Sequence, residues 1–391
     1  MSDYQAVTAV TVSGAVVFGM VLALLGSIKL ELARQFDLTG KRIAGLLATL
    51  NLALIPMTIL SGYLVDWWSP RTMMLLGSVL TSFAIFAMSR APSYRGALWA
   101  ALMAGLGAAA LCTASIKLMP HAFFPHSRPP LPGLSLGHVF IAVGALVTPA
   151  LADVLVHSLN FRKAVAILAF LCLTPAFLCA LPAFGHAVDD AVSRTSGAVT
   201  LFAADNLWKL VLAGVVFFFY APLEGSITVW ATTYLTDLGH GERRAAWILA
   251  GFWLMLLGSR LLTALIPFHP LWYPFLIVIP ALLALVFLGN LAGAGGWSAP
   301  RAGLLWLGFL LGPIFPTLIA VVFNCFKEDQ GLAYGCVFAM GSLGGLMLAP
   351  LVSARTTGGD AQTPFRVPLI LAMALSIAAL VFGLTVGRGG K

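Results

Sequence analysis

The spacing of the charged residues is the feature of this sequence that most constrains its fold. Long uncharged and mostly apolar runs follow one another from Tyr4 to Gly387. Most of these runs reach the roughly 20 residues that a helix needs to cross the hydrocarbon core of a bilayer. Only 9% of the residues are charged and 60% are hydrophobic, whereas a soluble domain carries about 25% charged residues. The chain is therefore predicted to be an all-α integral membrane protein.

The uncharged runs predict twelve transmembrane helices, arranged as six plus six. The first six are expected within Tyr4–Ile28, Ile43–Val65, Thr72–Ser89, Gly96–Ile116, Pro129–Ala152 and Ala164–Val188. The last six are expected within Leu210–Thr236, Ala245–Ser259 with its continuation, the rest of Leu261–Pro300 after a turn near Pro267–Pro270, Ala302–Phe326, Gln330–Ala354 and Val367–Gly387.

The longest polar connection, Gly185–Asp205, lies between the two groups of six. We therefore expect an N-terminal six-helix half over residues 1–184, a cytoplasmic linker over 185–205 and a C-terminal six-helix half over 206–391. Paired six-helix halves indicate an internal repeat, with a substrate site between the halves near the bilayer midplane.

One acidic residue stands out in the seventh predicted helix. Glu224 is the only formal charge between Leu210 and Thr236. A carboxylate deep in a membrane is costly unless it is paired, protonated or in contact with water, so it indicates a functional site. Pro222 and Gly225 flank Glu224, and both residue types loosen a helix and free backbone groups. The alternative is that Glu224 only clamps two helices together.

The predicted substrate-binding residues are Glu224, Tyr220, Trp230, Tyr234 and Asn51. Trp230 and Tyr234 lie about two and three helical turns beyond Glu224, and both carry a flat apolar ring with a polar group. Asn51 lies in the second predicted helix, where a buried amide needs hydrogen-bond partners. A carboxylate, an amide and an aromatic face together suit a small polyhydroxylated solute such as a sugar.

The connection after the second predicted helix carries the first motif, GYLVDWWSPR, from Gly62 to Arg71. It resembles the motif between helices 2 and 3 of the major facilitator superfamily, although Trp67 stands where a basic residue is usual. The resemblance implies a cytoplasmic gate latch made by Gly62, Asp66 and Arg71. Glycine allows close helix packing, and the acid can pair with a base or with a helix N-terminus in one gate state.

Further motifs resemble one branch of that superfamily, the fucose–galactose–glucose symporters and the sodium-dependent glucose transporters. The resemblance covers nearly the whole chain and implies the twelve-helix fold and transport by alternating access. The matching residues, besides the helix around Glu224, are Phe252, Trp253 and Arg260 of an FW…GR pattern, Ile314–Thr317 (IFPT), the glycine-rich run before Pro350, and His138, Gly144 and Pro149. Arg260 is interpreted as a gating residue that latches the second half.

Two acidic positions of the sugar–proton symporters are missing here. Cys112 stands where their fourth helix carries a glutamate, and the region of their helix 1 acid contains Gly26 and Ser27. Proton symport is therefore not implied by these two positions. Lys117, at the end of the fourth predicted helix, is interpreted as lining an inner vestibule or contacting lipid headgroups.

The distribution of basic residues leaves the membrane orientation open. The family resemblance implies a protein of the cell (inner) membrane with both termini in the cytoplasm. With that orientation only 9 of the 22 lysines and arginines lie inside, whereas the positive-inside rule places the excess inside. The opposite orientation is therefore the alternative.

The leading prediction is a secondary transporter of a sugar-like solute, with a proton or sodium ion as possible coupling partner. The alternative is a transporter or exporter of organic anions or amphipathic compounds, for which the net charge of +8 is one argument. No basic run exceeds two residues, which argues against nucleic acid binding. The cysteines form no CxxC pattern, so no metal site or cofactor is expected. Without a catalytic constellation the chain is not expected to be an enzyme, and we expect a monomer in the lipid bilayer.

Overall fold

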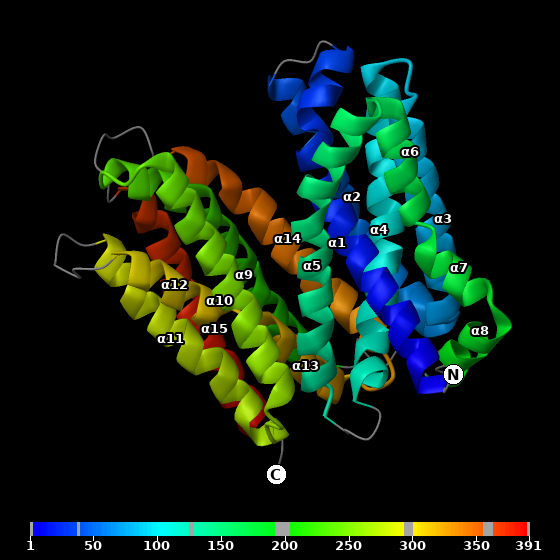
Figure 1. Ribbon diagram of the computed structural model, residues 1–391. Helices are drawn as coiled ribbons and strands as arrows, with labels where there is room; N and C mark the ends of the chain where they lie inside the picture. Colours follow the sequence, from blue (N-terminus) through cyan, green and yellow to red (C-terminus); the bar gives the residue numbers. More distant parts are fainter. Residues whose placement is uncertain are drawn as a thin grey trace. The chain divides into compact units, whose positions relative to one another are not determined.

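The computed structural model describes residues 3–36, 40–124, 129–191, 204–292, 300–354 and 363–388, and all regular structure among them is helical (Figure 1). Within these residues, twelve spans are long and apolar enough to cross a membrane. This confirms the predicted all-α membrane fold with twelve transmembrane helices.

The helices form two compact units. Unit 1 comprises Met1–Leu201 and Phe326–Ala339, and unit 2 comprises Phe202–Cys325 and Met340–Lys391. The predicted linker 185–205 begins inside a helix, and its residues 192–203 lie outside the described part of the chain. The boundaries 1–184 and 206–391 remain a prediction.

Unit 1 contains the first eight helices. They are α1 (Asp3–Phe36), α2 (Gly40–Trp67), α3 (Pro70–Ser89), α4 (Tyr94–Phe123), α5 (Leu131–Ser158), α6 (Phe161–Leu171), α7 (Thr174–Ala180) and α8 (Pro182–Ala191). The side chains of Ser69, Ser93 and Asn160 cap the starts of α3, α4 and α6 by accepting backbone N–H groups. The sixth predicted run is interrupted because Pro175 and Pro182 stand in the first turns of α7 and α8, where proline suits a helix start.

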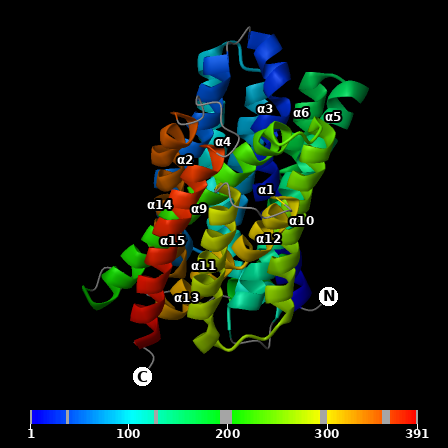
Figure 2. The ribbon, with the colours of Figure 1, turned by 90° about the vertical axis from the view of Figure 1, so that its left-hand side faces the viewer.

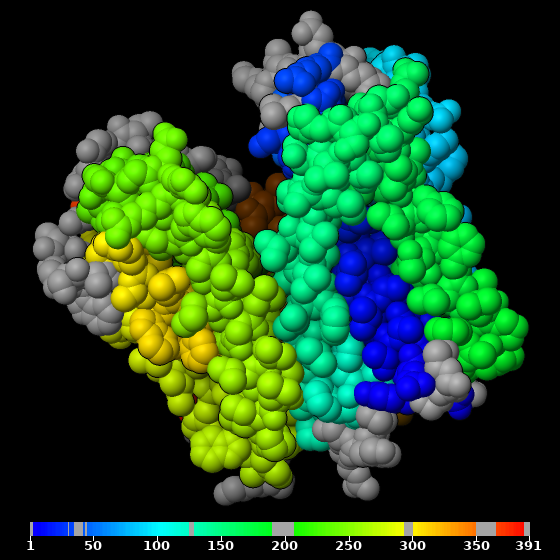
Figure 3. Space-filling view, in the orientation of Figure 1, coloured from blue at the N-terminus to red at the C-terminus, as the bar shows by residue number. Residues whose placement is uncertain are grey.

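Helices α1 and α5 pack backbone to backbone through glycines. A Cβ atom at Gly19 would overlap the carbonyl oxygen of Ile141, and one at Gly144 would overlap the carbonyl oxygen of Val16. Figure 3 shows α1 in blue beside α5 in blue-green on one face of unit 1. Small residues at helix contacts allow such close approach, and van der Waals packing of this kind drives helix association in lipid.

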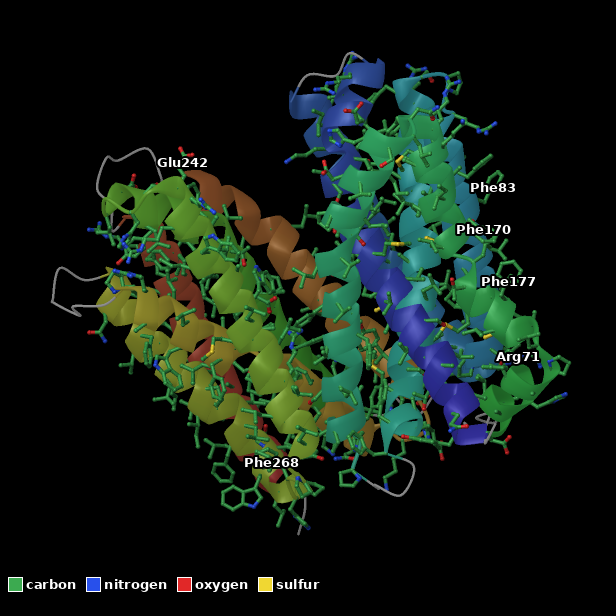
Figure 4. The ribbon with its side chains drawn as sticks, viewed as in Figure 1. Arg71, Phe83, Phe170, Phe177, Glu242 and Phe268 are labelled. Atoms are coloured by element: carbon green, nitrogen blue, oxygen red, sulfur yellow. The ribbon has the colours of Figure 1, made fainter. Side chains whose placement is uncertain are left out.

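The outer surface of unit 1 carries large apolar side chains. Phe83, Phe170 and Phe177 of α3, α6 and α7 are 55–66% exposed and point away from the unit (Figure 4). A water-soluble protein seldom exposes a contiguous apolar surface of this kind. This surface is therefore the face that contacts lipid.

Unit 2 contains the remaining helices, with α14 (Gln330–Ala354) contributing residues to both units. Figure 2 shows α9, α15 and α11 side by side. The α10–α11 connection falls at the turn predicted near Pro267–Pro270, whereas the predicted run Ala302–Phe326 is broken in two. The other elements of unit 2 are α9 (Ala204–Asp237), α10 (Glu242–Leu265), the 3₁₀ helix η1 (Pro270–Trp272), α11 (Tyr273–Ala292), α12 (Pro300–Leu311), α13 (Ile314–Cys325) and α15 (Thr363–Arg388).

The glycine contact between α1 and α5 leads to a stability prediction. Gly19→Ala should lower the melting temperature of the purified protein in detergent, because the new methyl group forces the helices apart at a cost of about 1–3 kcal/mol. Gly26→Ala on the same helix is the matched control, since a Cβ atom there meets nothing within 4 Å. Equal melting temperatures for the two variants would contradict this account of the packing.

Candidate functional site

The first candidate site is built around Glu224 of α9. Glu224 is partly buried, and Tyr220, one turn earlier, is 2% exposed. The Tyr220 hydroxyl donates a hydrogen bond of 3.0 Å to the carbonyl oxygen of Leu311. The same hydroxyl has the side chains of Glu224 and Arg260 as its two charged neighbours. Helices α9 and α10 therefore bring a carboxylate, a phenol and a guanidinium together, and α12 supplies the carbonyl that the phenol bonds.

The backbone of α9 is interrupted beside this cluster. Pro222 lies inside the helix and has no N–H group, so the carbonyl of Phe218, four residues earlier, loses its helical donor. Gly344 of α14 lies against this carbonyl, and a Cβ atom at Gly344 would overlap its oxygen. The absence of a side chain at Gly344 thus lets α14 cover the freed carbonyl of α9.

The break between α12 and α13 explains the position of Arg260. Pro316 removes the N–H group that would otherwise bond the carbonyl of Gly312. Arg260 supplies the missing donor, with 3.1 Å between its Nε atom and the Gly312 oxygen. Gly312 also lies directly against Ser259 and Leu256 of α10, which holds the two segments close together.

Glu224 and Arg260 do not form a direct ion pair in the described part of the chain, although both adjoin the Tyr220 hydroxyl. A carboxylate can accept several hydrogen bonds, so Glu224 has acceptor capacity for the hydroxyl or amine groups of a ligand. Arg260 is only 8% exposed, so it acts chiefly as a buried positive charge beside that carboxylate.

Two predicted aromatic residues lie further along α9. The indole nitrogen of Trp230 is buried and has no acceptor among the described residues. The Tyr234 hydroxyl lies 3.4 Å from the carbonyl oxygen of Leu291, and its ring meets that of Phe365 edge-on at 4.5 Å. Tyr234 is ten residues from Glu224, about 15 Å along the helix. The indole N–H of Trp230 is therefore a buried donor without an acceptor among the described residues, whereas Tyr234 packs against α11 and α15.

Asn51, the remaining predicted binding residue, lies on α2 in unit 1. Its side chain is exposed within that unit, and its amide nitrogen donates to the carbonyl of Leu47 at 3.0 Å. This bond uses one of the two amide N–H groups and leaves the amide oxygen available.

The second candidate site is the predicted latch, which lies within unit 1. Asp66, at the end of α2, accepts hydrogen bonds from the backbone N–H groups of Gly331 (3.0 Å) and Leu332 (2.8 Å) at the start of α14. Lys117 of α4 lies 2.6 Å from the same carboxylate, and its side chain is 4% exposed. The carboxylate thus compensates both the positive end of a helix dipole and a buried ammonium group.

Gly62 brings α2 and α14 together at this point. A Cβ atom at Gly62 would overlap the carbonyl oxygen of Gly331, and a Cβ atom at Gly331 would crowd Val65 and Asp66. Gly62 and Asp66 were predicted from the motif, whereas Lys117 was not recognised as the cationic partner of Asp66. The available signal was that Trp67 stands where the family motif usually has a base. The buried carboxylate then needs a cation from another part of the chain.

Arg71, the third predicted latch residue, is labelled in Figure 4 and has different partners. Its Nη1 atom lies 3.1 Å from a carboxylate oxygen of Asp189 in α8, and its Nε atom donates to the carbonyl of Cys179 in α7 at 3.1 Å. A Cβ atom at Gly185 would overlap the guanidinium, so α8 passes directly over Arg71. Arg71 therefore ties α3 to α7 and α8.

Cys112 occupies the place of the missing helix 4 acid. Its sulfur lies 3.0 Å from the hydroxyl oxygen of Tyr334, and both side chains are buried within unit 1. A thiol and a phenol therefore meet inside unit 1, at the position where the sequence resemblance implied an acid.

Comparison with known proteins decides the family. The family model described as Major Facilitator Superfamily matches residues 11–347. The chain belongs to the major facilitator superfamily. It is thus a multi-pass membrane protein of a transporter family and not an enzyme.

Two curated relatives within the superfamily differ in coverage. The agnestins efflux protein AgnL12 of Paecilomyces divaricatus is 25% identical over 315 residues, 75% of this chain and 67% of that protein. An uncharacterized MFS-type transporter of Mycobacterium tuberculosis is 36% identical over 152 residues, 36% of this chain and 32% of that protein.

Solved structures of the superfamily share the fold at low identity. The Escherichia coli fucose:proton symporter FucP has a TM-score of 0.76 at 16% identity, over 97% of this chain and 99% of that chain. The proton:xylose symporter XylE has a TM-score of 0.74 at 14% identity, over 98% and 96%. The human organic anion transporter MFSD10 has a TM-score of 0.72 at 16% identity, over 97% and 100%.

The Asp66–Lys117 pair leads to the second prediction. Lys117→Met should destabilise the protein by about 3–5 kcal/mol, because it leaves a buried carboxylate without its cation. Adding Asp66→Asn should recover part of the loss, since the amide oxygen still caps α14 without a charge. The melting temperatures of the variants in detergent measure both effects. Lys163→Met, at an exposed lysine of α6, is the control; a loss of equal size there would contradict the account.

Proposed function

We propose that the chain is a secondary transporter that moves a small polar, sugar-like solute by alternating access. The observation that carries this proposal is the cluster of Glu224, Tyr220 and Arg260 at two interrupted helices. Glu224 is the main ligand anchor in this proposal, Trp230 a further donor and Asn51 a ligand-binding residue of unit 1. Tyr234 has a supporting position in the wall of the site.

The chemistry of the cluster favours a polyhydroxylated ligand. Sugar hydroxyls donate to carboxylates and accept from N–H groups, and Glu224 and the buried indole N–H of Trp230 offer one group of each kind. The rings of Phe217 and Phe315 stack at 4.2 Å beside Tyr220, and a ligand pocket typically combines such apolar walls with few polar groups. The sugar:proton symporters FucP and XylE, which share the fold, lend support.

Gating is assigned to Gly62, Asp66 and Arg71 in this proposal. The carboxylate of Asp66 stabilises the start of α14 only while α14 lies against α2, so the contact favours one state of the cycle. Lys117 reinforces that contact, and Arg71 fixes the neighbouring segment of α7 and α8. Arg260, which the sequence suggested as a latch, takes part in the Glu224 cluster.

The second candidate function is the transport or export of organic anions or amphipathic compounds. A buried arginine beside the binding carboxylate favours it, because Arg260 attracts a negative charge. AgnL12 is named an efflux protein, and MFSD10 is named an organic anion transporter. A proton or a sodium ion remains the proposed coupling partner, with Glu224 as the acidic group that would bind it.

The third prediction separates the two substrate classes by the sign of one effect. Glu224→Gln should weaken binding of a neutral sugar by about 1–3 kcal/mol, because a charge-assisted hydrogen bond is lost. The same substitution should strengthen binding of an organic anion, because a like charge is removed. Binding to the purified protein is measured by thermal shift against panels of sugars and organic anions, and transport by uptake into proteoliposomes.

The matched control is Glu242→Gln, at an exposed position at the start of α10 (Figure 4). It should leave affinity unchanged for every ligand. If Glu224 is the proton site, Glu224→Gln should keep exchange of bound substrate and abolish accumulation driven by a pH gradient. A variant equal to wild type in binding and accumulation would reduce Glu224 to a helix clamp.

The fourth prediction concerns location and orientation. We propose that the chain lies in the cell membrane with both termini in the cytoplasm. In a variant without the five native cysteines, a cysteine introduced at Ser196, which lies outside the described residues, should react only with reagents that enter the cell. Labelling by a membrane-impermeant reagent in intact cells would instead support the orientation favoured by the basic residues.

A further inference from the structure

One end of unit 1, the upper end in Figure 1, carries a large excess of positive charge. Helices α1, α3 and α5 end there, and α2, α4 and α6 begin there. The sequence around these six helix ends has eight basic residues and only three acidic ones, namely Lys29, Arg34, Lys41, Arg42, Arg90, Arg95, Arg162 and Lys163 against Glu31, Asp37 and Asp153. The opposite end has three basic and four acidic residues, namely Arg71, Lys117 and Arg128 against Asp3, Asp66, Asp189 and Asp190. The positive excess is therefore confined to one end, where it attracts anions.

A cavity of about 620 Å³ lies at this basic end, between the last turns of α1 and the start of α6. Three cations, one acid, one amide and one aromatic ring line it, namely Arg34, Arg162, Lys163, Glu31, Asn160 and Phe161. Ligand pockets usually measure about 300–1,000 Å³. The cavity therefore has the size of a site for a small molecule or a headgroup.

The charge of the lining is positive. Arg162 and Lys163 are exposed and have no ion-pair partner among the described residues. The acid of the lining, Glu31, lies 2.6 Å from the Nη1 atom of Arg34 and compensates that cation. Asp37, which follows Arg34 by three positions, lies outside the described residues. Even with Asp37 counted as a second acid, three cations leave the lining with a net positive charge.

The donors of this lining suit a group with several charged oxygens. The side-chain oxygen of Asn160 accepts the backbone N–H group of Lys163 at 2.9 Å, so the start of α6 is fixed and the amide nitrogen of Asn160 still has two N–H groups to donate. Arg34 has five N–H donors, of which Glu31 engages one. Guanidinium groups bind phosphate oxygens in pairs, and an ammonium group adds a compact charge. A carboxylate has only two oxygens for these donors, whereas a phosphate monoester has three.

The cavity lies at the boundary of the membrane spans. The span of α1 ends at Lys29, and the span of α6 begins at Phe161. Arg34 lies about 7.5 Å beyond the end of the first span. A phosphate group reaches this depth either as part of a soluble ester or as part of a lipid headgroup.

We propose that this cavity binds a phosphate group. Arg162 and Lys163 supply the charge, and Asn160 and Arg34 supply further N–H donors. A soluble phosphate ester and a phospholipid headgroup present the same oxygens to these residues, and the two sources are separated by the experiment below. The site lies within unit 1 and does not depend on which solute is transported.

The test is isothermal titration calorimetry of the purified full-length protein in lipid-free detergent. Glycerol 3-phosphate is the soluble probe, short-chain phosphatidylglycerol the lipid probe and glycerol the neutral control, which should not bind. Binding of glycerol 3-phosphate identifies a soluble ester as sufficient, and binding of phosphatidylglycerol alone identifies a headgroup. Arg162→Gln should weaken whichever phosphate probe binds about tenfold, the effect of one lost charge-assisted hydrogen bond.

Arg95→Gln is the matched control. Arg95 is the second residue of α4, as Arg162 is of α6, and both follow a side chain that caps the helix start. Both arginines are exposed at the same end of unit 1, but Arg95 does not line the cavity. Arg95→Gln should therefore leave the affinity for the phosphate probe unchanged.

A second variant should change the affinity in the opposite direction. Glu31→Gln should strengthen phosphate binding about twofold to fivefold, because it removes the acid of the lining and releases Arg34 from its ion pair. Misfolding does not produce such a gain. Asp153→Asn is the control, since Asp153 is an exposed acid at the same end, 3.2 Å from His157, and does not line the cavity.

The proposal is wrong if neither phosphate probe binds to the wild-type protein. It is also wrong if Arg95→Gln weakens binding as much as Arg162→Gln, because the basic end then attracts anions without a defined site. Weaker or unchanged binding by Glu31→Gln would likewise contradict it, since the acid of the lining would then not oppose the ligand.

Discussion

Backbone polar groups inside a membrane have no water to bond, and each unsatisfied group costs several kcal/mol. This constraint explains why all regular structure in the described residues is helical, and why charged side chains lie at helix ends and breaks. Pro316 frees the carbonyl of Gly312, and Arg260 bonds it. The first turn of α14 has N–H groups without helical acceptors, and Asp66 bonds two of them. Both charge clusters thus bond backbone groups that lack helical partners, one at a helix break and the other at a helix start.

The same residues therefore serve folding and proposed function together. A helix interruption in lipid is stable only where protein groups surround it or where it lines a cavity. The Glu224 cluster has two interruptions in the same neighbourhood, at Pro222 and at Pro316. Such a place holds polar groups in fixed positions before a ligand arrives, which lowers the cost of binding. If the proposed site is correct, loss of Arg260 would affect the fold and ligand binding together.

Much of the fold and part of the site were predictable from sequence for physical reasons. The thickness of the hydrocarbon core sets the length of each transmembrane helix, and the spacing of charged residues shows where such helices lie. A lone acid such as Glu224 is conspicuous in an apolar helix. The partners were not predictable in this way. Lys117 lies 51 positions from Asp66, and Arg260 bonds a carbonyl 52 positions away. Tyr234 shares a helix with Glu224, yet its environment depends on which face α11 and α15 cover.

The glycines at helix contacts have a consequence for how such a chain can diverge over evolutionary time. At Gly19, Gly62 and Gly344 the neighbour of the missing side chain is a main-chain carbonyl, which every amino acid carries. A compensating substitution in the partner helix therefore cannot make room, as it can where two side chains meet. We therefore expect these positions to keep glycine individually and not as covarying pairs, whereas the exposed phenylalanines of α3 and α6 need only stay apolar.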